Sequence, residues 1–579
     1  MTADRVASVP AAERRLEGRL APEPGRVRAR VLLVGFEDQD NLGLRYLSSR
    51  LKAEGHHTRI VAFGQGSGPV LEAVRELRPH VVGFSLIFQF MAPQFHQVLT
   101  ELRAAGVTAH FTMGGHYASF EHQALLAAIP ELDSVVRYEG EDTLLELAER
   151  IANQEPWTGV AGLAYRTASG AATSAPRHGR DNLDELPWPD RDDIRYEARA
   201  MPTASMLGSR GCPWVCSFCS IITFYEGNGT KGRRRRDPAR IADELEYLHR
   251  ERGVRIILWQ DDDFLAGGPA AVRWAHSLAD ETIRRGLHHG LRWKLSCRSD
   301  EVRPSSLQPL VEAGLTHVYL GVESGDKESL RNMNKRLEPD VHLRAGDTLR
   351  QLGLTFDFGF MLMEPWSTIA SVRNNIAFLR RFVGDGASPA TFCRMLPYVG
   401  TASETRLRDE GRLFENNLRA DYNFLDPRLD VFYTWMLETF NQRNFTASGT
   451  LNLLRLLMFE ANLKLPDRPV RPMLKMAIQA IASVNNLMVF DILDAALDYV
   501  ESATAIGPSG PSGVDSAERA ADRSGDSNSA DRSDDRCSAH PFLRMLTREH
   551  STQDARSRED IKALLSQLPA AREPDHACV

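Results

Sequence analysis

Three cysteines stand close together in the 579-residue sequence. In the stretch GSRGCPWVCSFCS, Cys212, Cys216 and Cys219 are separated by three and then by two residues. Four thiolates would close the coordination of a four-iron four-sulfur (4Fe-4S) cluster for electron transfer, whereas three leave one iron open to a small molecule. The alternative is a zinc site completed by a distant His or Cys, although structural zinc sites usually pair two short ligand couples. The spacing therefore favours a cluster with one open iron.

This cysteine motif resembles that of the radical S-adenosylmethionine (SAM) superfamily, because the aromatic Phe218 precedes the last cysteine and the motif follows a probable strand. The resemblance implies that the open iron binds the amino and carboxylate groups of SAM, with Phe218 beside the adenine. Further SAM contacts are implied at Asp261, Asp262 and Asp263 for the amino group, at Arg298 for the carboxylate, and at Glu323 and Ser324 of GVESG for hydroxyl or carboxylate groups. The acidic run replaces the usual Gly-Gly-Glu, and a solvated turn and a surface arginine are the alternatives.

A second pattern follows the first probable strand. Asp38, Asp40 and Gly43 have the spacing of the Asp-x-His-x-x-Gly motif of cobalamin-binding domains, and Ser85 and the pair Gly114–Gly115 follow at matching intervals. The resemblance implies that Ser85 meets the dimethylbenzimidazole and that the glycines let the nucleotide tail pass close to the backbone. Because Asp40 replaces the lower axial histidine, cobalamin is expected to bind base-off without a protein imidazole. The alternative is a domain of this fold that binds nothing.

Other motifs point to a narrower group. YEGED, with Glu139, Gly140 and Glu141, resembles a motif of the cobalamin-type radical SAM group that includes the anaerobic magnesium-protoporphyrin cyclase and its methyltransferase relatives. LDELPWPDRD and PYVGT resemble that group as well. The resemblance covers residues 30 to 405.

Strands must position these residues, and the sequence contains two series of strands that alternate with helices. From Arg30, apolar runs and amphipathic helices alternate, which predicts a doubly wound parallel sheet. A second series predicts an open, partial (β/α)6 barrel, with Cys297 and Cys393 as core residues. Its strands are expected at ASMLGS, RIILWQ, RWKLSC, HVYLGV, FDFGFML and ATFCRML.

The expected fold class is therefore α/β, and its helical C-terminal region follows from strong amphipathic patterns after Pro397. The last part of the chain has too few large apolar residues to offset its ordering entropy. The predicted domains are a loose leader (1–28), a Rossmann-like cobalamin-binding domain (29–152), a linker (153–202), the radical SAM barrel (203–405), a helical domain (406–501) and a largely disordered tail (502–579).

The composition indicates which kinds of binding partner and which cellular location to expect. The net charge of −7 and the absence of a polybasic region give no sign of a nucleic-acid partner. The run Arg233–Arg236 is expected to be a solvated loop, or else a contact to an anionic cofactor or substrate. The sequence has neither a signal-peptide run nor about 20 uninterrupted apolar residues, so we expect a cytoplasmic protein without a membrane partner.

Together the resemblances imply a cobalamin-dependent radical SAM methyltransferase. It would move a methyl group from SAM via methylcobalamin to an unactivated carbon, or to phosphorus, of a small-molecule substrate in specialised metabolism such as antibiotic biosynthesis. An external one-electron donor such as flavodoxin or ferredoxin would reduce the cluster. The alternative is a cyclase or rearrangement enzyme with the same cofactors and no methyl transfer. A cobalamin carrier is disfavoured because it would not need the cysteine motif.

Overall fold

A computed structural model describes most of the chain, namely residues 26–37, 40–64, 66–196, 202–416, 419–463, 471–502 and 541–566. Most of the expected leader and most of the expected disordered tail lie outside these residues, as does Asp38. The described chain divides into two compact units. One comprises residues up to 37, 41–179 and 185–192, and the other comprises 38–40, 180–184 and the chain from 193 onward.

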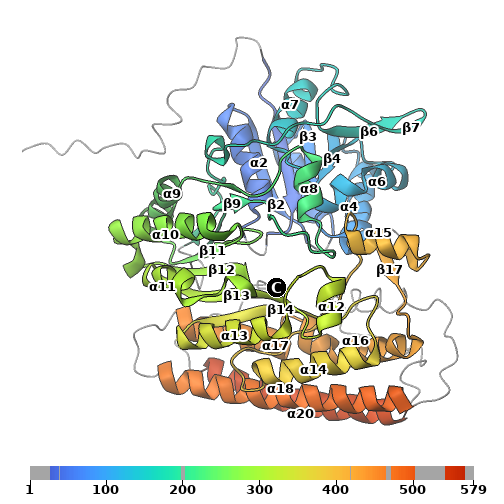
Figure 1. The fold of residues 1–579 in the computed structure, drawn as a ribbon. Helices are drawn as coiled ribbons and strands as arrows, with labels where there is room; N and C mark the ends of the chain where they lie inside the picture. Colours follow the sequence, from blue (N-terminus) through green and yellow to red (C-terminus); the bar gives the residue numbers. More distant parts are fainter. Residues whose placement is uncertain are drawn as a thin grey trace, which may run out of the picture. The chain divides into compact units, whose positions relative to one another are not determined.

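A seven-stranded sheet forms the first unit, with the strand order β2-β1-β3-β4-β5-β6-β7 (Figure 1). Strands β1 to β5 are parallel and alternate with helices, which confirms the predicted doubly wound sheet. The elements are β1 (Arg30–Gly35), α2 (Leu42–Ala53), β2 (His57–Ala62), α3 (Gly68–Leu77), β3 (Val81–Ser85), α4 (Ala92–Ala104), β4 (His110–Gly114), α5 (His116–Phe120), α6 (His122–Ala128), β5 (Ser134–Val136) and α7 (Glu141–Ala152).

The interval 153–202, predicted as a linker, also contributes to this sheet. Strands β6 (Leu163–Thr167) and β7 (Gly170–Thr173) form an antiparallel hairpin beside β5. Both strands are rich in small and polar residues, and β7 is mostly exposed, so neither carries the apolar run that marks a buried strand. The hairpin was therefore not visible in the hydrophobic pattern.

A six-stranded parallel sheet forms the centre of the second unit, with the order β15-β14-β13-β12-β11-β8. This curled half-barrel confirms the predicted partial (β/α)6 barrel, although β15 has only two residues. Its elements are β8 (Thr203–Met206), β9 (Ser209–Arg210), α8 (Ile221–Gly227), β10 (Arg234–Arg235), α9 (Pro238–Arg250), β11 (Ile256–Trp259), α10 (Gly268–Arg284), β12 (Arg292–Arg298), α11 (Pro304–Glu312), β13 (Leu315–Glu323), α12 (Lys327–Asn332), α13 (Pro339–Gln351), β14 (Thr355–Met363), α14 (Ile369–Val383) and β15 (Cys393–Arg394).

The two faces of the central strand β13 differ. Val318, Leu320 and Val322 are fully buried in the core that the sheet shares with its helices. Tyr319 points to the opposite side and is 36% exposed. Because successive side chains alternate across a strand, His317 and Glu323 share this second face with Tyr319, and we call it the inner face.

Helices dominate the C-terminal part of the second unit, as predicted. Helix α14 packs against α18, and α18 packs against α20 (Figure 1). Helix α20 is much longer than the short pattern IKALLSQL indicated, because its first half is rich in polar residues. The elements are α15 (Ala402–Asp409), the hairpin β16 (Leu413–Asn416) and β17 (Arg419–Tyr422), α16 (Pro427–Phe445), α17 (Thr450–Leu463), α18 (Arg471–Ser502) and α20 (Pro541–Ser566).

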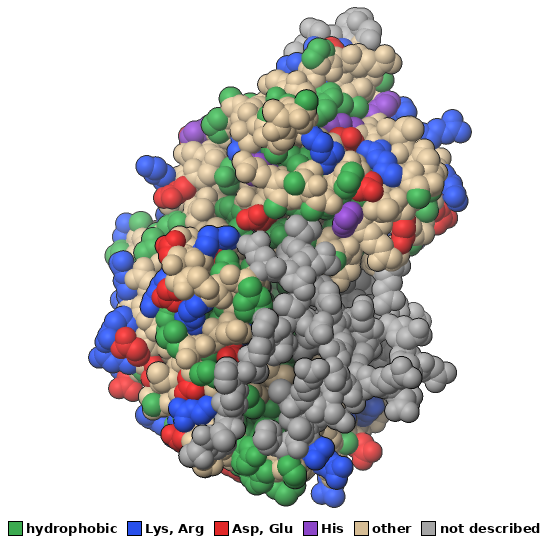
Figure 2. Space-filling model, turned by 90° about the vertical axis from the view of Figure 1, so that its right-hand side faces the viewer, with side chains coloured by type: hydrophobic (Ala, Val, Ile, Leu, Met, Phe, Trp, Pro, Cys, Tyr) green, Lys and Arg blue, Asp and Glu red, His purple; other side chains and the backbone are tan. Residues whose placement is uncertain are grey.

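One helix among the described residues, Pro472–Ser502, is long and apolar enough to cross a membrane by length and composition alone. Half of its most apolar stretch is buried, which is also expected of a helix that packs between two others. On the face shown in Figure 2, acidic and basic side chains are interspersed over the described residues. A mixed surface of this kind fits the modest net charge of −7.

Candidate functional site

The cysteine motif forms the loop between β9 and α8, directly after the first barrel strand. All three thiols are free and partly buried. Cys212 and Cys216 each lie close enough to Cys219 for their charges to interact. Burial raises the pKa of Cys212 and of Cys219 to about 12, so these thiols would stay protonated at neutral pH without a metal. Binding to iron supplies the charge that deprotonates a thiol.

The arrangement suits a cluster better than a single ion. Within the described part of the chain, no three His, Cys, Asp or Glu side chains converge closely enough to hold one metal ion. A 4Fe-4S cluster instead gives each cysteine its own iron and tolerates a wider spacing of thiols. The donor set of three partly buried thiols, with Lys335 and Arg298 nearby, therefore fits the predicted cluster.

The acidic run follows β11 and contacts the backbone just before the cysteines. Asp261 accepts hydrogen bonds from Gly208 N at 3.0 Å and from the Ser209 hydroxyl. Asp262 accepts one from Gly211 N at 2.8 Å. Loss of hydration among the surrounding protein atoms raises the pKa of Asp262 to about 6, although part of its side chain is accessible to solvent. These two acids hold the segment that leads into the loop, and their contact with SAM stays a prediction.

The arginine run is not the solvated loop that the sequence predicted. The Arg233 side chain is 2% exposed, and it donates to Ser209 Oγ at 2.7 Å and to Phe264 O at 2.7 Å. Arg236 is also buried and forms an ion pair with Glu244 at 2.8 Å. Backbone carbonyls and carboxylates that are distant in sequence satisfy these cations, which local composition could not indicate.

Glu323 stands at the carboxyl end of β13, where the register with β14 shifts at a bulge. Its φ of 70° lies in the left-handed region that non-glycine residues rarely adopt. Its carboxylate lies 3.2 Å from Lys335 Nζ. Neighbouring Gly321 provides space for the lysine, because an added Cβ there would lie 3.0 Å from Lys335 Nζ. Backbone strain of this kind concentrates at functional sites.

This strain predicts that two substitutions at position 323 differ in stability but not in SAM binding. Glu323→Gly and Glu323→Ala both remove the carboxylate, so we expect equally weakened SAM binding by calorimetry. Glycine adopts the left-handed conformation without steric cost, and this relief of strain exceeds the larger loss of backbone entropy that glycine undergoes on folding. The Glu323→Gly barrel should therefore be about 1 kcal/mol more stable than the Glu323→Ala barrel. Thermal unfolding of the two variants side by side checks the difference. An Ala variant as stable as the Gly variant would show that the backbone at this position is unstrained.

Two other predicted SAM contacts are engaged with protein groups. Ser324 is fully buried, and its hydroxyl donates to Asn375 Oδ1 at 2.8 Å. Phe218 packs against a cluster of three methionines, Met333, Met361 and Met395. Their roles toward SAM stay predictions, and the structure gives each of them a packing role as well.

The inner face also holds residues that the sequence analysis missed. Cys393, predicted as a core residue, is exposed, whereas Cys297 is buried as expected. Loss of hydration among the surrounding protein atoms raises the pKa of Cys393 to about 12 and also raises that of Tyr319, and the nearby Glu323 carboxylate adds to both shifts. The prediction for Cys393 was wrong because β15 has only two residues. So short a strand shows no alternation in hydrophobicity that could mark Cys393 as exposed.

In the first unit, three neighbouring strands end in small residues. β1 ends at Gly35, β3 at Ser85 and β4 at Gly114, and Ser85 pairs with Gly114 in register. The carboxyl edge of a parallel sheet without bulky side chains can take a nucleotide close to the backbone. This edge therefore fits the predicted cobalamin tail, with Ser85 and Gly114 as the candidate contacts.

Gly115 and Gly43 have different surroundings. An added Cβ at Gly115 would lie 2.6 Å from Leu86 O, and its φ is 104°. Gly115 is therefore required by the turn itself, whatever its role toward cobalamin. Gly43 lies in the first turn of α2, after the cap formed by Asn41, whose Oδ1 accepts from Leu44 N at 3.1 Å.

Asp40, predicted in place of an axial histidine, belongs to the second unit and is 5% exposed. Its Oδ2 accepts hydrogen bonds from the Tyr196 hydroxyl at 2.9 Å and from Ser205 N at 3.1 Å. The carboxylate thus caps the backbone of the first barrel strand. No pattern around residue 40 could have revealed partners more than 150 residues away.

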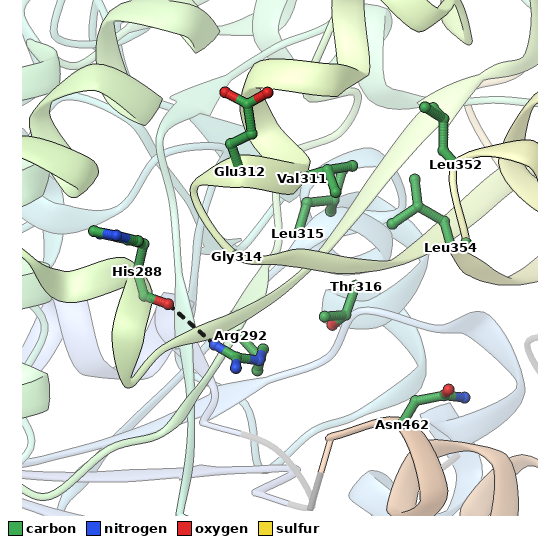
Figure 3. A pocket seen from close by; sticks show the side chains of 11 residues that line it. His288, Arg292, Val311, Glu312, Gly314, Leu315, Thr316, Leu352, Leu354 and Asn462 are labelled. Carbon is green, nitrogen blue, oxygen red and sulfur yellow. Dashed lines mark hydrogen bonds between the residues drawn. The ribbon is translucent and has the colours of Figure 1, made fainter. Parts of the chain in front are cut away.

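A pocket of about 310 Å³ opens elsewhere on the barrel (Figure 3). Arg292 and Leu315, which line it, begin β12 and β13. The cysteine loop and Asp261 instead follow the carboxyl ends of strands, and Arg298 and Glu323 are the last residues of β12 and β13. Active sites of barrels with parallel strands lie at the carboxyl ends, so we place the candidate site there and not in this pocket.

Comparison with known proteins agrees with this fold. Residues 206–372 match the radical SAM superfamily, and residues 31–148 match the B12 binding domain. An uncharacterized methyltransferase of Pyrococcus horikoshii is 27% identical over 72% of this chain and 86% of its own. The anaerobic magnesium-protoporphyrin IX monomethyl ester cyclase of Rubrivivax gelatinosus is 27% identical over 66% of this chain and 68% of its own.

The solved structure of the cobalamin-dependent SAM radical enzyme OxsB, with aqua-cobalamin and SAM bound, covers 94% of this chain and 82% of its own. Its TM-score is 0.66 at 15% sequence identity, so the likeness concerns the fold. The barrel with its cysteine loop is a radical SAM domain. The chain thus combines a radical SAM domain with a B12-binding domain, and its cofactors are a 4Fe-4S cluster, SAM and cobalamin.

Proposed function

We propose that this chain is a cobalamin-dependent radical SAM methyltransferase that methylates an unactivated carbon, or phosphorus, of a small molecule in specialised metabolism. The observation that carries the proposal is the loop of three free thiols in a chain that also has a B12-binding domain. The name of the Pyrococcus relative supports methyl transfer, and other relatives are named methylases or methyltransferases too.

When bound, the cluster with SAM supplies hydrogen-atom abstraction and cobalamin supplies a methyl group. The residues of the chain orient these groups and exclude water. Cys212, Cys216 and Cys219 would hold the cluster, and the Glu323–Lys335 pair would face SAM. The methionines that pack against Phe218 would keep the adenine side of the site dry.

We place the substrate on the inner face of the barrel sheet, where Tyr319 and Cys393 are accessible. Farther down this face His317 Nε2 lies 3.3 Å from Asp357, which is 3.6 Å from Arg455 of α17. Helix α17 therefore reaches the inner face with a charged side chain. This contact supports a role of the C-terminal helices in substrate specificity.

The reductant and the compartment are part of the same proposal. Cys297 and Cys393 are the only further cysteines among the described residues, and they do not stand in a short cluster motif. We therefore propose that an external flavodoxin or ferredoxin delivers the electron. Such donors are cytoplasmic, which agrees with the predicted location of the protein.

Methyl transfer predicts that two SAM molecules are consumed for each product. One should appear as S-adenosylhomocysteine and the other as deoxyadenosine plus methionine, because the methyl donation and the radical cleavage use different SAM molecules. Anaerobic turnover of a metabolite panel with methyl-deuterated SAM, followed by mass spectrometry, checks both the ratio and the label in the product.

The second candidate function is cyclisation or rearrangement, which the name of the Rubrivivax relative favours. A cyclase would form deoxyadenosine without a matching amount of S-adenosylhomocysteine. A product that lacks the deuterated methyl group would therefore select the cyclase over the methyltransferase.

A further inference from the structure

The cysteine loop is hydrogen-bonded to Ser403 of α15 and, through more bonds, to one short segment at the end of α12. Asn334 Nδ2 donates to Val215 O at 2.8 Å. Ser217 donates twice, from its backbone N to Met333 O at 2.9 Å and from its hydroxyl to Asn332 O at 2.8 Å. The position of the loop therefore depends in part on how this segment is held.

Arg298 joins the loop to that segment. The guanidinium carbon lies 4.2 Å from the centre of the Trp214 ring. Nη1 lies 3.7 Å from Cys216 Sγ, and Nη2 donates to Lys335 O at 2.7 Å. Asp300 accepts only from Nε, at 3.1 Å. One side chain, 5% exposed, thus contacts the loop's aromatic ring, one of its thiols and the backbone of the supporting segment.

This geometry differs from the role that the sequence indicated, a contact with the SAM carboxylate. The planar guanidinium presents donors in fixed directions, and three of them already have partners in the chain. A cation beside a cluster sulfur favours the more negative, reduced cluster and raises its reduction potential, because hydrogen bonds and net charge at the sulfurs set that potential.

We propose that Arg298 is a positioning residue for the cluster, which fixes Cys216 and supplies the positive charge that makes the cluster easier to reduce. Lys335 also acts on Cys216 through its charge, but its ammonium is paired with Glu323 at 3.2 Å, whereas Arg298 donates to the sulfur itself. The proposal rests on the cluster and not on methyl transfer.

Two variants separate the charge from the geometry. Arg298→Gln keeps a hydrogen-bond donor and loses the charge, whereas Arg298→Lys keeps the charge and loses the planar fork. Arg303→Gln removes an exposed arginine nearby and is the matched control. Each protein is reconstituted with iron and sulfide, and its iron content, its iron loss to a chelator, its SAM affinity and an electron paramagnetic resonance (EPR) redox titration are measured.

We expect the reduced-to-oxidised ratio of Arg298→Gln, poised at the wild-type midpoint, to fall about tenfold, which is 59 mV for one electron. Arg298→Lys should keep a midpoint near that of the wild type but lose iron several times faster, and Arg303→Gln should match the wild type. A folded variant that takes up no iron also supports the positioning role. If Arg298→Gln does not fold, the iron loss of Arg298→Lys decides the question.

One result would overturn the proposal. If Arg298→Gln keeps the wild-type midpoint and iron retention while its SAM affinity falls, Arg298 is a carboxylate contact. Failure of the wild-type chain to assemble a cluster would instead contradict the cofactor assignment, so the two failures are distinguishable.

Discussion

Replacement of Cys212, Cys216 and Cys219 by alanine should remove about four irons per chain and bring deoxyadenosine formation to the background level. The reason is that these three thiols share one loop and the described residues offer no alternative metal site. Iron analysis after anaerobic reconstitution, with chromatography of SAM cleavage products under dithionite, measures both effects.

Cys393→Ser is the matched control for iron content, because it removes an accessible thiol of the same barrel that lies outside the loop. It should retain the full complement of iron. Stoichiometric iron together with deoxyadenosine formation in the triple variant would show that the cluster assignment is wrong.

Bound cobalamin should be base-off, without nitrogen hyperfine coupling from a protein histidine in the EPR spectrum of the reduced cofactor. Asp40 occupies the position of the histidine in the family motif, and its carboxylate is already bonded to Tyr196 and Ser205. A spectrum with imidazole coupling would contradict the assignment.

The glycine pair tests where the cofactor tail lies. Gly114→Val places a bulky side chain on the carboxyl edge of β4 at a position where an added Cβ would lie 3.3 Å from Val136 O and 3.9 Å from Val136 Cβ. We expect a loss of cobalamin affinity of at least about tenfold with a folded protein, about the effect of 1.4 kcal/mol. Gly115→Ala is the contrasting variant, since it should destabilise the first unit through the contact with Leu86 O, whether or not cobalamin is present.

Much of the fold could be predicted because buried parallel strands appear as continuous apolar runs. Runs such as VLLVGF and HVYLGV, each followed by a helical pattern, were sufficient for both sheets. The hairpin β6–β7 was missed since β7 is small, polar and mostly exposed, and β6 has no continuous apolar run. The first half of α20 was missed because its polar residues hide the helical period.

The candidate site was predictable only where a motif is local. Cys212, Cys216 and Cys219 lie within eight residues and were evident from the sequence. The partner of Glu323 was not, because Lys335 reaches it from the segment after α12. Arg298 was singled out for its place at a strand end, and its contact with Cys216 depends on tertiary packing that no spacing encodes.

The position of Asp40 bears on how such proteins arise. The residue precedes α2 in the sequence, yet it belongs to the barrel unit and satisfies the backbone of its first strand. A division of the chain between residues 153 and 202 would separate that strand from its acceptor and leave the buried N–H of Ser205 unsatisfied. The two domains are therefore poor candidates for exchange as independent modules, and recombination within the group should favour segments that carry residues 38–40 together with the barrel.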